Sequence, residues 1–68
     1  MAYKNFKISV WSNFTDGVNS FSTCLDVLTI KARSESEAKR KAHQKYPINH
    51  RTEGKKITWH SARLESAL

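Results

Sequence analysis

The sequence predicts a small α+β domain: a three-stranded, mainly antiparallel sheet with one helix packed on one face, in the chain order β-β-α-β. Three observations lead to this class. Residues 5–11 alternate between polar and apolar side chains, which is typical of a half-buried strand. Ser34 opens a helical pattern that stops before Pro47, and residues 56–64 return to alternation. A chain of 68 residues has room for one core, so we expect a single domain over 1–68 with an ordered core over roughly 4–64.

The first strand is followed by a hairpin loop. Phe6, Ile8 and Val10 fall on one side of the strand, and polar residues with Trp11 fall on the other. The dipeptide Asp16-Gly17 is a strong turn signal because glycine accepts positive φ, and neighbouring asparagines and serines indicate a loop longer than two residues.

The second strand, "FSTCLDVLTIKA", changes phase along its length. Apolar residues lie mainly on odd positions up to Val27 and on even positions from Leu28 onward. A β-bulge at this pair would point both halves of the strand inward. A bent strand, or two short strands, would also accommodate the change.

The helix is predicted from its caps and from its apolar spacing. Ser34 and Glu37 have the spacing of a capping box, in which each side chain satisfies a backbone N–H at the other residue. Ala38, Ala42 and Tyr46 recur every fourth residue and form a narrow apolar stripe that suits close packing on a sheet. The proline after Tyr46 should end the helix.

The third strand is expected at residues 56–64, after a polar, basic loop at 48–56, and the last four residues are expected to be frayed. A right-handed crossover through the helix makes the second and third strands parallel, so the first strand lies between them in the order 2-1-3. Ile57 and Trp59 should face the helix, and Thr58 and His60 should face away. The predicted core consists of Phe6, Ile8, Val10, Leu28, Ile30, Ala38, Ala42, Ile57 and Trp59.

Composition favours a basic binding protein and disfavours several other classes. Twelve Lys and Arg residues against six Asp and Glu residues give a net charge of +6, which attracts polyanions. The lone Cys24 cannot form an internal disulfide, which fits a reducing cytoplasm. No apolar run approaches the ~20 residues that span a bilayer, so no membrane partner is expected.

Motifs for catalysis, metal binding and cofactor binding are not recognised. The spacing of His43, His50, His60 and Cys24 matches no structural zinc site. Two glycines cannot supply a Gly-rich phosphate loop, and no nucleophile–base motif is evident. We therefore expect a protein that is not an enzyme and that needs no cofactor.

Two surfaces are candidates for partner binding. The first is the sheet face turned away from the helix, which is predicted to carry Lys7, Trp11, Lys31 and His60. Such a surface could stack bases and neutralise phosphates, or it could anchor a protein partner through a central aromatic side chain. Alternatively, Trp11 folds under the hairpin loop and completes the core.

The second candidate is a basic edge that runs from the helix into the loop after it. Its members are Lys41, Lys45, Arg51, Lys55 and Lys56. Such an edge could track a phosphate backbone. The helix cations could equally form a solvated face, since cations are favourable near a helix C-terminus.

The layout resembles that of small phage and mobile-element proteins. The segments "FKISVWS", "VLTIKARSESEAKRKAHQKYP" and "KKITWHSARL" are similar in arrangement to the small RNA polymerase inhibitors of podoviral phages. The resemblance implies a non-catalytic protein that docks on a bacterial protein or nucleoprotein complex in the cytoplasm of the host and blocks it. A basic chain would be expected to bind an acidic or nucleic-acid-binding surface of that complex, and direct binding of DNA or RNA is the alternative.

Overall fold

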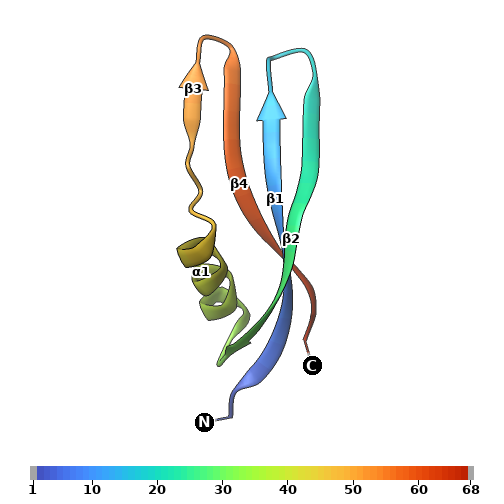
Figure 1. Ribbon diagram of the computed structural model, residues 1–68, viewed down its shortest axis with the longest axis vertical. Helices are drawn as coiled ribbons and strands as arrows, with labels where there is room; N and C mark the ends of the chain where they lie inside the picture. Colours follow the sequence, from blue (N-terminus) through green and yellow to red (C-terminus); the bar gives the residue numbers. More distant parts are fainter. Residues whose placement is uncertain (1, 68) are drawn as a thin grey trace.

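The computed structural model describes residues 2–67, over which the chain forms four strands and one helix (Figure 1). The elements are β1 (Lys4–Thr15), β2 (Ser20–Ala32), α1 (Glu35–Lys45), β3 (Arg51–Glu53) and β4 (Lys56–Ala67). Every strand pair is antiparallel, and the sheet order is β2-β1-β4-β3. The α+β class and the order of the three long strands are confirmed. The prediction of a three-stranded sheet is wrong, because β3 adds a fourth strand at one edge.

The additional strand β3 lies in the segment that the sequence predicts to be a loop. A two-residue turn at Gly54-Lys55 joins it to β4, with Glu53 paired to Lys56. Gly54 has a φ of +64°, and glycine at the first turn position suits a tight hairpin. All three residues of β3 are exposed and none is apolar. The segment therefore carries no hydrophobic alternation from which a strand could be predicted.

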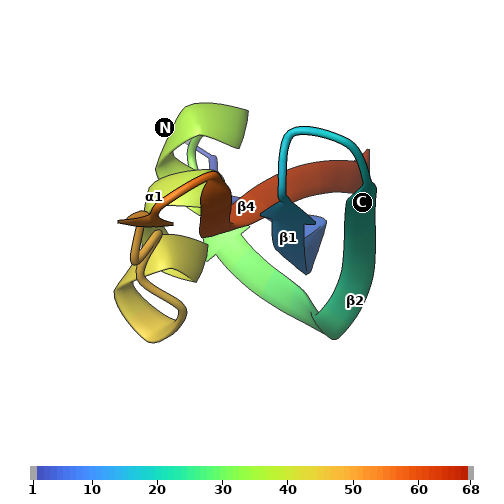
Figure 2. The ribbon, with the colours of Figure 1, turned by 90° about the horizontal axis from the view of Figure 1, so that it is seen from above.

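The helix covers only one end of an elongated sheet. The molecule measures 46 × 17 × 14 Å, and α1 packs on β1, β2 and β4 without contacting β3 within the described residues. Figure 1 places α1 beside the lower part of the long strands and both hairpin turns at the opposite end. Viewed from above, the helix lies to one side of the twisted sheet (Figure 2). Within residues 2–67, one face of the sheet is therefore covered by no other element along its whole length, and the other face is covered only where α1 lies.

The core lies where the helix meets the sheet. Its buried apolar residues are Phe6, Ile8, Val10, Ala32, Ala38 and Ala42, and those packed against them are Leu28, Ile30, Tyr46, Ala62 and Leu64. The prediction is confirmed for β1 and the helix stripe, whereas Leu28 and Ile30 are only partly buried. No residue from Trp11 to Lys31 is buried, so the far end of the sheet has no core of its own.

The side-chain phase of β4 is opposite to the predicted one. Ile57 and Trp59 do not join the core, because Leu64 stands opposite Ile8 and Ala62 stands opposite Val10. Even-numbered positions of this strand therefore face the helix up to Leu64. The odd positions carry the larger apolar residues at the start of β4, where no helix is present to cover them.

The phase change in β2 arises from a bulge, although not at the predicted pair. Val10 is paired with Asp26 and Trp11 with Cys24, so Leu25 is the extra residue. The bulge turns Phe21 and Thr23 before it, and the even positions after it, to the helix side of the sheet, but the first half of the strand stays exposed. Leu25 and Val27 remain 46% and 47% exposed, and only the even positions of β2 after the bulge contribute to the core.

The helix begins and ends as predicted, with one difference at its first turn. The Ser34 hydroxyl accepts a hydrogen bond from the Glu37 N–H at 3.3 Å. The Glu37 carboxylate forms an ion pair with Lys41 instead of returning a bond to Ser34. Tyr46 is the C-cap residue, and its N–H donates to the Ala42 carbonyl at 2.9 Å.

The C-terminal segment is more ordered than predicted. Strand β4 continues to Ala67, which pairs with Phe6 at the start of β1. Pairing of these backbones accounts for the order of residues 65–67. The last predicted frayed residue, Leu68, lies outside the described part of the chain.

Candidate functional site

The sheet face opposite the helix is uncovered, and the strand register determines which side chains share it. Residues directly opposite each other on neighbouring strands point to the same side of a sheet. Trp11 is opposite Cys24 of β2 and Ser61 of β4, and Asn13 is opposite Trp59. We call this surface the open face. Its main members are Lys7, Ser9, Trp11, Asn13, Thr29, Lys31, Trp59, Ser61 and Arg63.

Trp11 is half-buried at the centre of the open face. Its Nε1–H donates to the Ser9 hydroxyl at 2.8 Å, and that hydroxyl donates to Glu65 Oε1 at 2.7 Å. Ser9 is only 1% exposed. The alternative in which Trp11 packs against Phe14 or Phe21 is wrong, because those two rings face each other on the helix side, 6.1 Å apart. Trp11 therefore presents part of its ring to solvent in an orientation fixed by Ser9.

A shallow hollow of about 330 Å³ lies beside Trp11. Its other lining residues are Asn13, Ser22, Ser61 and Arg63. The Asn13 side chain is held from both sides, since its amide nitrogen donates to the Ser61 hydroxyl at 2.9 Å and its oxygen accepts from Ser22 at 2.8 Å. The hollow thus combines one aromatic wall, fixed polar groups and one guanidinium, which is a combination suited to binding a ligand or a side chain of a partner.

The open face is positively charged. Lys7, Lys31 and Arg63 are exposed on it, whereas the carboxylate of Glu65 is engaged by Ser9. Within residues 2–67 the only ion pairs are two pairs inside α1, so the three open-face cations have no carboxylate partner. Their charge is available to an acidic or phosphate-bearing partner.

His60 does not lie on the open face, contrary to the sequence-based prediction. It stands opposite Ser12 on the helix side of the sheet. Its Nδ1 is 2.9 Å from the Pro47 carbonyl oxygen, and its backbone N–H donates to the Ile48 carbonyl at 2.7 Å. The reason is the phase of β4, in which the need to bury Leu64 places all nearby even positions on the helix side.

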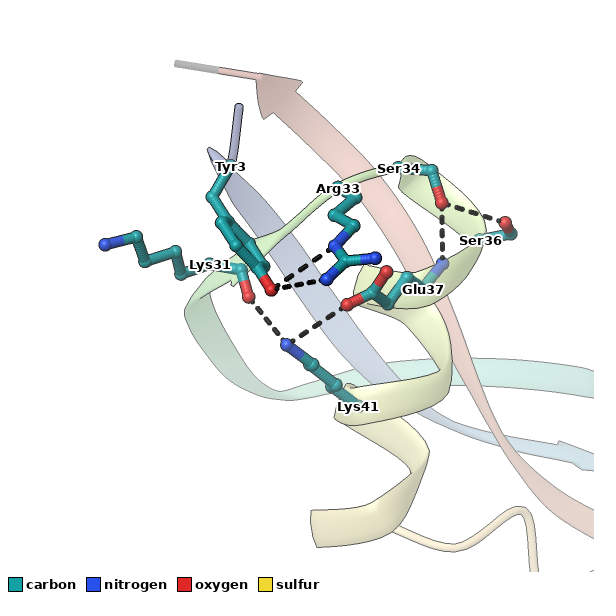
Figure 3. A network of polar contacts seen from close by, with 7 residues as sticks. All are labelled: Tyr3, Lys31, Arg33, Ser34, Ser36, Glu37 and Lys41. Atoms are coloured by element: carbon teal, nitrogen blue, oxygen red, sulfur yellow. Dashed lines mark hydrogen bonds and ion pairs between the residues drawn. The ribbon is translucent and has the colours of Figure 1, made fainter. Parts of the chain in front are cut away.

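Lys41, in the middle of α1, makes contacts with residues of the same chain that lie around the first turn of the helix (Figure 3). Its Nζ donates to the Lys31 carbonyl at 2.9 Å and lies 3.4 Å from Glu37 and 6.0 Å from the centre of the Tyr3 ring. Arg33 donates two hydrogen bonds to the Tyr3 hydroxyl, at 3.1 and 3.2 Å. These contacts fix the entry of the chain into α1 and leave less of the Lys41 charge for a partner.

The basic edge is divided into two groups. Lys45 lies near the end of α1, with Nζ 5.8 Å from the centre of the Tyr46 ring. Arg51, Lys55 and Lys56 belong to the β3–β4 hairpin, whose turn lies at the end of the molecule away from the helix (Figure 1). The continuous edge predicted from the sequence does not form, because the chain pairs into a hairpin after residue 50 instead of staying beside the helix.

A hydrogen bond between Tyr46 and Asp26 attaches the end of the helix to β2. The Tyr46 hydroxyl donates to Asp26 Oδ2 at 2.8 Å, and the Val27 N–H donates to Oδ1 at 2.8 Å. The Tyr46 bond, followed by the Val27 bond, lowers the pKa of Asp26 below its ordinary value. The same contact raises the pKa of Tyr46, because ionised Asp26 stabilises the protonated phenol.

Within residues 2–67, no three His, Cys, Asp or Glu side chains gather as a metal site. Over the same residues, no helix has the length and apolar character needed to cross a membrane. Comparison with protein-family models, curated proteins and solved structures finds no significant match to this chain.

Sequence reasoning missed Asn13, Trp59 and Arg63 as open-face residues. For Trp59 and Arg63, the signal that could have found them is Leu64, since a leucine near the end of a strand competes with Trp59 for the core. If Leu64 is assigned to the core, both Trp59 and Arg63 fall on the other side of the strand. Asn13 was missed because β1 continues past Trp11, with the same alternation, into the segment predicted to be a loop.

Proposed function

We propose that this protein is a small, non-catalytic binding module that docks through its open face on an acidic protein surface. The observation that carries the proposal is an uncovered sheet face on which Trp11 lies beside Arg63 and which also carries Lys7 and Lys31 further along the sheet, all three cations without an ion-pair partner among residues 2–67. The layout resemblance to phage polymerase inhibitors favours a bacterial protein or nucleoprotein complex as the partner, in the host cytoplasm, and inhibition as the consequence of docking.

Physical reasoning supports an interface of this kind. A fixed aromatic side chain loses little conformational entropy on binding, and tryptophan and arginine are the residues most enriched at the energetic centre of interfaces. Ser9 orients Trp11, and the adjacent hollow offers space for a side chain of the partner. The cations of the open face would speed association with an acidic surface.

Direct binding of single-stranded DNA or RNA is the second candidate. It is favoured by the presence of both Trp11 and Trp59 on one positively charged face, since bases stack on aromatic rings while cations neutralise phosphates. This mode predicts a steep loss of affinity with salt, whereas a protein interface with an aromatic anchor should respond more gently.

An affinity pull-down from bacterial lysate, with and without nuclease, separates the two candidates. The double variant Lys7→Glu/Arg63→Glu reverses two charges on the open face. The matched control Lys55→Glu/Lys56→Glu makes the same change in charge on the β3–β4 hairpin. Our proposal predicts a protein partner that survives nuclease, is lost with the first variant and is retained with the control.

Other outcomes would change the assignment. Loss of every partner on nuclease treatment would favour the nucleic-acid candidate. Equal retention by both variants, each shown to be folded by circular dichroism, would exclude the open face. Equal loss with both would mean that net charge alone drives the capture.

A further inference from the structure

A second hollow, polar in character, lies on the helix side of the sheet where the chain passes from α1 into β3. Its volume is about 440 Å³. It is lined by Ser12, Asn49, His50, Arg51, Thr58, Trp59 and His60. Three of these residues are basic or can become so, three others carry hydroxyl or amide groups, and none is a carboxylate. This composition is suited to an anion.

His60 fixes the segment that enters the hollow. Its backbone N–H donates a hydrogen bond to the Ile48 carbonyl, and its Nδ1 lies 2.9 Å from the Pro47 carbonyl oxygen. A carbonyl oxygen only accepts, so Nδ1 carries the proton in this contact. The other ring nitrogen, Nε2, makes no hydrogen bond to another of residues 2–67 and can donate to an anion when the ring is protonated. Asn49 turns the chain with a φ of 49°, a conformation that asparagine tolerates well.

The register brings donors from three strands onto the same side of the sheet. Arg51 of β3 stands opposite Thr58 of β4, and His60 stands opposite Ser12 of β1. Arg51 forms no ion pair within the described residues, although Glu53 lies on the same strand. A guanidinium that lacks a carboxylate partner, beside hydroxyl and imidazole donors, matches the several oxygens of a phosphate group.

We propose that this hollow binds a phosphate group, either as free phosphate or as a small phosphomonoester such as a nucleoside monophosphate. Arg51 would provide paired N–H donors, Ser12 and Thr58 their hydroxyls, and His50 and His60 their imidazoles. Its donors on the strands, Ser12, Arg51, Thr58 and His60, lie on the opposite side of the sheet from the open face, and Trp59 is the one lining residue that also belongs to that face. Because none of these donors belongs to the open face, the phosphate proposal stands or fails independently of the function proposed above.

Nuclear magnetic resonance on the full chain tests the proposal. Amide signals are followed during titration with inorganic phosphate, in a second arm with a nucleoside monophosphate, and in a control with sodium chloride at matched ionic strength. We expect saturable shifts centred on residues 49–51 and 58–60 with a Kd of about 1 mM for phosphate, a plausible strength for so small a ligand. Tighter binding of the monophosphate would identify an ester as the source, and equal binding would identify free phosphate.

A matched pair of variants separates a built site from general charge attraction. Arg51→Gln and Lys55→Gln each remove one exposed cation from the same hairpin, but only Arg51 lines the hollow. Arg51→Gln should weaken phosphate binding about tenfold, the usual effect of losing a charge-assisted hydrogen bond, and Lys55→Gln less than about twofold. Shifts that fail to saturate, that sodium chloride reproduces, or that both variants reduce equally would overturn the proposal.

Discussion

Replacing Ile8 with alanine should remove most of the stability of this protein. Ile8 is fully buried and stands opposite Leu28 on one neighbouring strand and Leu64 on the other. The change deletes three carbon groups at ~0.8 kcal/mol each and leaves a cavity beneath the helix, for a total of ~2–5 kcal/mol. One small core rarely supplies more than ~3–5 kcal/mol. We therefore expect a chain that is largely unfolded at 25 °C.

Urea titration followed by circular dichroism measures this loss, with Val27→Ala as the control. Val27 lies on the open face of β2 and is half exposed, so its truncation should cost less than ~1 kcal/mol. An Ile8→Ala protein that unfolded at nearly the same urea concentration as the parent would refute the central place of Ile8 in the core. A Val27→Ala protein equally destabilised would refute the assignment of the two faces.

Three other predictions concern single contacts. Ser34→Ala should lower stability by ~0.5–2 kcal/mol through loss of the helix cap, and an unchanged melting temperature would contradict that role. The folded-state pKa of Asp26 is lowered and that of Tyr46 is raised, so stability should fall as pH drops below about 4 and again as it rises above about 10. Asp26→Asn should lose part of the acid dependence in urea titrations at several pH values, and an unchanged acid limb would exclude this contact. Ser9→Ala removes the acceptor of the Trp11 indole and should shift tryptophan emission to longer wavelength, whereas an unchanged spectrum would show that the bond does not fix the ring.

The helix and the first strand were predictable because their signals are local. The Ser34 cap, the alanine stripe and the proline after Tyr46 determine the helix within its own sequence. The alternation of Phe6, Ile8 and Val10 is uninterrupted, so only one face could be buried. In both elements, the preference of the residues for helix or strand agrees with the packing that buries one of their faces.

The phase of β4 and the existence of β3 depend on partners far along the chain. Trp59 and Leu64 lie on opposite sides of one strand, and each could be assigned to a core. The helix decides between them, since it covers the sheet only where Leu64 lies. Strand β3 gains its pairing from β4 and buries no side chain, so its own residues carry no sign of it apart from Gly54.

The residues of the candidate sites divide in the same way, into those that a local pattern predicts and those whose placement depends on distant strands. Lys7, Trp11 and Lys31 were assigned to the open face from the clean alternation of β1 and of the end of β2. His60 was misplaced and Arg63 was missed, because both assignments required the correct phase of β4. The hollow proposed to bind phosphate combines residues from β1, the segment before β3, β3 itself and β4, so no single stretch of sequence contains it.

Two β-bulges change which positions of β2 and β4 face the helix side of the sheet. If Leu25 were paired in regular register, Phe21 would stand opposite Thr15 on the open face; the bulge instead places Phe21 opposite Phe14. If Glu65 were paired in regular register, Ser66 would stand opposite Phe6, where the structure places Ala67. Each bulge thus exchanges a polar partner for an apolar one on the helix side. The residue displaced by the second bulge, Glu65, is the one whose carboxylate receives the Ser9 hydroxyl beneath Trp11. The same irregularity that places Ala67 opposite Phe6 therefore also supplies the contact that orients the tryptophan of the open face.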